Sequence, residues 1–156
     1  MIGGGASAAA SFSSGRSSGL DVTPVAPAWA ATRGAADAFL VLTVDHAKKS
    51  AGVHAQGSGG YAALHSLLQA VDGKAALFGA LPYMSKGQPR HAFFCFLPPG
   101  LTGMARGRVS LQRAAVYAAL EGVVGDLTLD DADAAQPAAV AAALSRIPGA
   151  HDVQLL

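Results

Sequence analysis

Apolar residues recur along this chain with two different periods, and these periods predict the order of its helices and strands. Residues 37–46 hold a near-continuous apolar run, which is typical of a central strand covered on both faces. Residues 60–71 instead place leucines three and four positions apart, the spacing of a helix with one buried face. Short polar intervals rich in Gly, Pro, Ser and Asp separate these segments and predict turns.

The same patterns predict the remaining elements. We expect helices over residues 24–33, 60–71, 102–121 and 137–147, strands over 37–46, 52–56, 74–83, 90–97 and 125–129, and a short edge strand within 150–156. Two hairpins, each followed by a helix, imply a mixed sheet with helices on both faces. The fold class that we predict is therefore α/β (α+β), with one central sheet of five or six strands.

Several large apolar residues are predicted to form the core of this fold. Trp29 would face inward from the first helix. The strands and the long helix would contribute Phe39, Phe78, Leu111, Val116 and Leu120. Aromatic residues are few, so we expect aliphatic side chains to supply most of the buried area.

Length and composition limit what the chain can be. Its 156 residues fit one domain. We place that domain at residues 21–156, because residues 1–20 are mostly Gly, Ala and Ser and bury too little apolar surface to offset the entropy of ordering. They do not resemble a signal peptide, and no apolar run reaches the roughly 18 residues that span a bilayer. Cys95 is the single cysteine, so we expect a buried thiol and a cytoplasmic protein.

Positive charge is concentrated in one part of an otherwise nearly neutral chain, whose net charge is +1. The run from residue 74 to residue 120 contains no Asp or Glu. It carries six of the eleven basic residues: Lys74, Lys86, Arg90, Arg106, Arg108 and Arg113. Because no carboxylate within the run offsets them, this distribution predicts one electropositive surface that meets an acidic partner.

Catalytic and metal-binding patterns are weak. The glycine-rich turn at 57–60 precedes a predicted helix and resembles an anion-binding turn, but it lacks the lysine of a nucleotide-binding loop. The five histidines have no metal-ligand spacing, and Cys95 has no cysteine partner. No set of residues supplies a nucleophile, a base and an oxyanion hole. We therefore expect a protein that is not an enzyme and that uses no cofactor or metal.

A set of linked motifs resembles a known family. An aromatic strand (93–97) is followed by Pro98-Pro99-Gly100 and then by a helix start, Gly103-Met104-Ala105-Arg106-Gly107-Arg108. The loop Met84-Ser85-Lys86 precedes them, and the segment 125–130 follows the long helix. From about residue 40 to residue 153 these features resemble the ADF/cofilin-homology (ADF-H) domain, and within it the coactosin branch. The resemblance implies a single ADF-H-type domain.

This resemblance also implies a partner and a site. Proteins of the family bind actin by pressing the long helix against it, and coactosins favour filaments. The resemblance thus implies an actin-binding cytoskeletal protein that acts as a monomer and regulates filament dynamics. The predicted contacts are Arg106 and Arg108 at the helix start, with Arg113 on the same helical face as Arg106 and Met104 as an apolar contact. Lys86 and Arg90 form a second patch that would meet a neighbouring actin subunit.

Other functions remain open at this point. The same fold could bind monomeric actin or, as glia-maturation-factor-like domains do, the complex that branches filaments. A nucleic-acid-binding module would use the same basic surface, but it would need exposed aromatic residues among the basic ones and a larger net charge. An enzyme would use a small-molecule site near residues 57–60. We expect neither nucleic acid nor a membrane span.

Overall fold

The computed structural model describes residues 19–71, 73 and 75–156. Most of the predicted tail, residues 1–18, and the first basic residue of the acid-free run, Lys74, lie outside the described residues. Ordered secondary structure within the described part begins with an isolated parallel bridge between Asp21 and Ser50. This bridge fastens the chain beside the first hairpin before the first helix starts.

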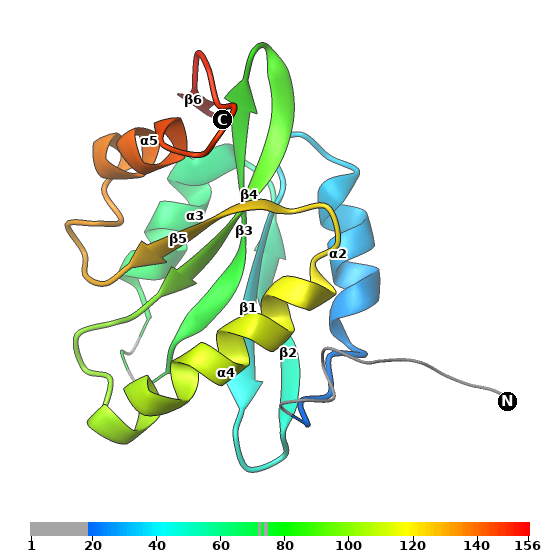
Figure 1. The fold of residues 1–156 in the computed structure, drawn as a ribbon, viewed down its shortest axis with the longest axis vertical. Helices are drawn as coiled ribbons and strands as arrows, with labels where there is room; N and C mark the ends of the chain where they lie inside the picture. The colour runs from blue at the N-terminus through cyan, green and yellow to red at the C-terminus, as the bar shows by residue number, and fades with distance from the viewer. Residues whose placement is uncertain (1–18, 72, 74) are drawn as a thin grey trace, which may run out of the picture.

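Helices and strands follow one another in the predicted order (Figure 1). The elements are α2 (Val25–Arg33), β1 (Phe39–Asp45), β2 (Ser50–Gly57), α3 (Gly60–Gln69), β3 (Leu77–Ser85), β4 (Gln88–Phe96), α4 (Gly103–Ala119), β5 (Val124–Leu129), α5 (Pro137–Ser145) and β6 (Gln154–Leu155). The short C-terminal strand that we predicted is β6. The hydrophobic periods therefore identified the type of each of these elements.

One six-stranded mixed sheet forms the centre of the molecule. Its strands lie in the order β2-β1-β3-β4-β5, and β6 pairs with the far end of β3. Every pairing is antiparallel except that of β4 with β5, which α4 connects as a crossover. The mixed sheet with helices on both faces is confirmed.

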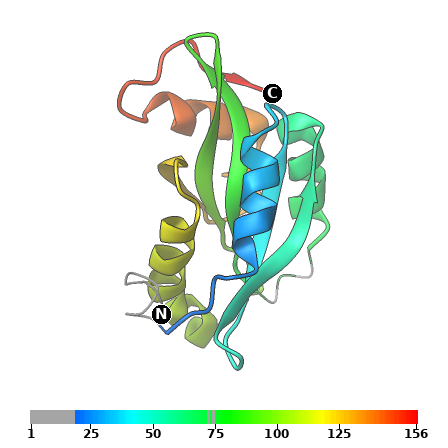
Figure 2. The ribbon, with the colours of Figure 1, turned by 90° about the vertical axis from the view of Figure 1, so that its right-hand side faces the viewer.

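Two separate cores lie on the two faces of this sheet. Along β4, Phe94 and Phe96 pack into the core under α3 and α5, whereas Phe93 and Cys95 pack into the core under α2 and α4. This alternation follows from the two-residue period of a strand. Figure 2 shows the sheet between α3 on one side and α4 on the other. The predicted buried positions Trp29, Phe39, Phe78, Val116 and Leu120 are confirmed.

Leu111 does not belong to the core, and this prediction was wrong. Its side chain is 65% exposed, whereas Val109 and Val116 on the same helix are buried. Successive helical residues are rotated by about 100°, so Leu111 lies about 200° from Val109 and faces away from the sheet. The apolar stripe of α4 thus runs through Val109 and Val116 and continues to Leu120 just after the helix, and Leu111 is left on the surface.

Candidate functional site

The first turns of α4 hold basic residues at a place where they weaken the helix. Thr102 caps the helix, its Oγ1 accepting a hydrogen bond from the Ala105 N–H at 3.1 Å. No acid stands in the first turn, and Arg106 is exposed near the positive end of the helix dipole. A cation there costs roughly 0.3–1 kcal/mol. Gly103 and Gly107 lower helix stability further. A surface that opposes local stability in this way is typical of a binding site.

The solvent-facing side of α4 combines large apolar residues with small ones. Met104, Leu111 and Tyr117 are 71%, 65% and 39% exposed. Between them runs an exposed row of small residues: Gly107, Ser110, Ala114 and Ala118. Small side chains let the main chain of a partner approach the helix closely. The apolar side chains at the edges can then be buried in the contact.

The two arginines at the start of α4 lie on opposite edges of this exposed side. They are two residues apart, which is a rotation of about 200°. Arg106 is exposed, and Arg108 is half-buried beside the β1–β2 hairpin. Among the described residues neither of them forms an ion pair. Both charges are therefore available to a partner, but in different directions.

Arg113 is paired within the protein. Its guanidinium bonds to Asp126 at the beginning of β5, with Nε donating to Oδ1 at 3.0 Å and with a second, shorter bond from Nη2. The Arg113 side chain is 23% exposed and that of Asp126 is 52% exposed. The ion pair offsets much of the charge that Arg113 would offer. Arg106 and Arg113 lie on the same edge of α4, and a carboxylate offsets only the charge of Arg113 among the described residues.

The second predicted patch lies at the tip of the β3–β4 hairpin. Lys86 and Gly87 both have positive φ, 55° and 71°, as in a two-residue type I′ turn. The Lys86 N–H donates to the carbonyl oxygen of His151 at 2.8 Å, so the tip is tied to the segment before β6. Arg90 is exposed and contacts Gln88 at 3.4 Å. A hollow of about 240 Å³ lies between Lys86, Arg90 and the chain after α5.

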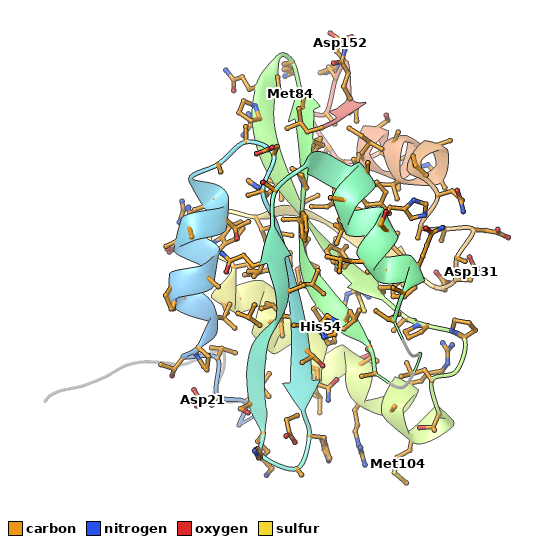
Figure 3. All side chains as sticks on the ribbon, turned by 180° about the vertical axis from the view of Figure 1, so that it is seen from behind. Asp21, His54, Met84, Met104, Asp131 and Asp152 are labelled. Atoms are coloured by element: carbon orange, nitrogen blue, oxygen red, sulfur yellow. The ribbon has the colours of Figure 1, made fainter. Side chains whose placement is uncertain are left out.

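The structure therefore divides the predicted site residues into two patches. Met104, Arg106 and Arg108 lie at the start of α4, at one end of the long axis of the molecule (Figures 1 and 3). Lys86 and Arg90 belong to the hairpin at the opposite end, next to Met84 in Figure 3. A partner that contacts both patches must therefore extend along the long axis of the molecule.

The glycine-rich turn before α3 does not offer the free N–H groups of an anion site. The Gly59 N–H donates to the Asp37 carboxylate at 3.3 Å, and the Gly60 N–H donates to the Asp37 main-chain oxygen at 3.0 Å. The Tyr61 N–H donates to the main-chain oxygen of Leu156. A carboxylate at this turn also repels phosphate. Gly59 is the residue that precedes α3, with a φ of 107°.

Other reactive groups are inaccessible or scattered. Burial raises the pKa of the Cys95 thiol to about 11, so it is protonated at neutral pH. Within the described part of the chain, no group of His, Cys, Asp and Glu residues could hold a metal ion. In the same part, none of the helices has the length and apolar character needed to cross a bilayer.

Three residues that sequence reasoning did not include lie close to this site. Lys49 and His46 of the β1–β2 hairpin, together with Leu111, surround a hollow beside Arg108. From the sequence, Lys49 lies in a polar interval between two predicted strands, and Leu111 was predicted to belong to the core. Only the packing of the hairpin against α4 brings them together.

Comparison with known proteins identifies the fold. No family model matches the chain, and no curated protein sequence matches it. Solved structures do match. Coactosin from Entamoeba histolytica is 20% identical, covering 80% of this chain and 94% of its own, with a TM-score of 0.68. Human coactosin-like protein is 14% identical, covering 85% of this chain and 92% of its own, with a TM-score of 0.66.

Mouse coactosin, described as an actin filament binding protein, is 15% identical, covering 84% of this chain and 94% of its own, with a TM-score of 0.63. The chain has the ADF/cofilin-homology fold. The ADF-H fold that the motifs implied is thus confirmed. In this ADF-H fold, α4 is the long helix and the β3–β4 hairpin stands at the far end of the sheet.

Proposed function

We propose that this ADF-H-fold protein binds actin filaments through the start of α4. The observation that carries the proposal is Arg106, which is exposed and forms no ion pair with any described residue, on an acid-free helix that also exposes Met104 and Leu111. Arg106 and Arg108 attract and orient an acidic protein surface. Met104 supplies an adaptable apolar contact. Arg113 contributes through its ion pair with Asp126, which fixes that edge of the helix.

The separation of the two patches supports a preference for filaments. A filament presents neighbouring subunits, so α4 can contact one of them while Lys86 and Arg90 contact the next. A monomer offers only one subunit, and binding would then use one patch alone. Two weak contacts on one rigid body reinforce each other. We propose a monomeric, non-enzymatic cytoskeletal protein of the cytoplasm that decorates and regulates filaments in this way.

Binding of monomeric actin is compatible with the same fold, but it leaves one patch without a role. Binding of the filament-branching complex is compatible with the same fold as well. Nucleic-acid binding has less support. Tyr117 is the one exposed large aromatic side chain of α4, and it is 39% exposed. A stacking platform needs aromatic faces interleaved with the basic residues.

Co-sedimentation with filaments tests the proposal. The protein should pellet with filamentous actin at low salt, and binding should weaken as salt rises, because exposed charges are screened. Binding to monomeric actin, measured on a native gel, should be weaker. A gel shift with single-stranded and duplex DNA at physiological salt should be negative. A DNA shift with no pelleting would replace this function by the nucleic-acid alternative.

A further inference from the structure

A small hollow lies between the β1–β2 hairpin and α4. It holds about 90 Å³. Its lining consists of Leu20, Val44, His46, Lys49, Arg108, Leu111 and Gln112. Pockets for small-molecule ligands usually hold about 300–1,000 Å³. This hollow is therefore too small for a nucleotide or a comparable metabolite, but its size suits one aliphatic side chain of another protein.

Positive groups surround the hollow. Arg108 approaches it from α4 and Lys49 from the hairpin, with His46 beside them. Among the residues that the structure describes, no carboxylate lines it, and α4 contains no acid. The nearest acids of the hairpin region are engaged elsewhere: Asp45 accepts the Lys48 N–H at 3.1 Å, and Asp21 accepts the Thr23 N–H at 2.9 Å. The charge of this region thus complements an acidic partner.

The apolar part of the hollow is unusually open. Leu111 is 65% exposed although it lies on a helix whose other face is well packed. Met104, seven residues earlier and therefore on the same edge of α4, is 71% exposed. The hollow continues the surface that we propose to bind actin, since Arg108 and Leu111 both belong to α4.

Lys49 holds a costly backbone conformation at this place. Its φ is 51°, in the left-handed region that glycine and asparagine occupy more easily. This conformation belongs to the tight turn that joins β1 and β2, in which the Lys49 N–H donates to the His46 oxygen at 3.3 Å, and it places Lys49 at the rim of the hollow.

We propose that this hollow receives an apolar side chain of actin next to a carboxylate, so that the β1–β2 hairpin forms part of the filament contact. The apolar side chain packs against Leu111 and Val44, and the carboxylate lies between Arg108 and Lys49. This inference rests on the proposed function. It extends the contact beyond the start of α4 to the β1–β2 hairpin.

Co-sedimentation of paired variants tests the inference. The test variant is Lys49→Ala with Leu111→Ser, and the control is Lys48→Ala with Val53→Ser, which removes the same charge and an exposed apolar side chain away from the hollow. We expect the test variant to lose filament affinity by roughly tenfold and the control by less than about twofold. Equal far-ultraviolet circular dichroism and equal denaturation midpoints would show that both variants fold.

The possible outcomes separate the two claims. If the wild-type protein does not pellet with filaments, the proposed function and this inference both fail. If the wild type pellets and Arg106→Ala weakens it, while the Lys49/Leu111 variant binds like the wild type, the inference alone is wrong. If the purified protein self-associates and only the Lys49/Leu111 variant stays monomeric in sedimentation velocity, the hollow binds a second copy and the inference is wrong.

Discussion

Lys49 and Lys86 share an uncommon backbone state at the tips of two hairpins. Their φ angles are 51° and 55°. A side chain with a Cβ in this region costs roughly 1–2 kcal/mol relative to the right-handed region. Both lysines are exposed and neither pairs with an acid among the described residues. The protein accepts this strain at the two places where we propose that a partner binds.

Replacing Lys86 should therefore separate stability from binding. Asparagine followed by Gly87 is the preferred sequence of a type I′ turn, so Lys86→Asn should raise the free energy of unfolding by a part of the roughly 1–2 kcal/mol that the left-handed conformation costs. The same change removes a contact charge and should weaken filament binding. Urea denaturation followed by Trp29 fluorescence and co-sedimentation would measure the two effects. Weaker binding without any gain in stability would contradict the strain argument.

His91 should make stability depend on pH. Its Nε2 lies 2.8 Å from the Ala38 oxygen and its ring packs against Trp29. Burial lowers the pKa of His91, an effect that the bond to Ala38 partly opposes. The folded state then binds fewer protons than the unfolded state below a pH of about 6.5, so stability falls as pH falls through this value.

His91→Gln keeps a donor for the Ala38 oxygen but does not titrate. Its free energy of unfolding should change less between pH 7 and pH 5 than that of the wild type. Urea denaturation at several pH values would measure the difference. Identical pH profiles for the two proteins would assign the dependence to other groups.

At the scale of elements, α4 shows what can and cannot be predicted from a sequence. Its existence and its acid-free character follow directly from residues 102–121. The exposure of Leu111 does not, because Ala105, Val109 and Val116 form the stripe that packs on the sheet. Likewise, the pairing of Arg113 with Asp126 joins residues on two elements. A pattern along one helix cannot reveal which acid the next strand places beside it.

Gly107 should lower the stability of α4, and no neighbouring atom requires a glycine at this position. A Cβ added there would meet nothing within 4 Å. Gly107→Ala should therefore raise the free energy of unfolding by up to about 1 kcal/mol. As a control, Gly79→Ala should be strongly destabilising, because its Cβ would lie only 1.9 Å from the Leu40 oxygen. Thermal denaturation would compare them, and a destabilised Gly107→Ala variant would contradict this view of the helix.

At the scale of the molecule, the sequence predicted which segments form the sheet and that helices cover both faces. It did not predict the strand order β2-β1-β3-β4-β5 or the pairing of β6 with β3. These depend on contacts between segments far apart in the chain, such as Met84 with Gln154. The same non-local packing brings Lys49 to Arg108 and places the β3–β4 hairpin, which carries Lys86 in its turn, at the other end of the molecule.

The most direct test of the account is the filament affinity of an Arg106→Ala, Arg108→Ala variant. Its matched control is Arg33→Ala with Arg146→Ala, which removes two exposed arginines from the last turn of α2 and the end of α5. Co-sedimentation should show a loss of roughly tenfold or more for the first variant and little change for the control. Equal affinity of the two variants, whether both weakened or both unchanged, would contradict a binding site at the start of α4.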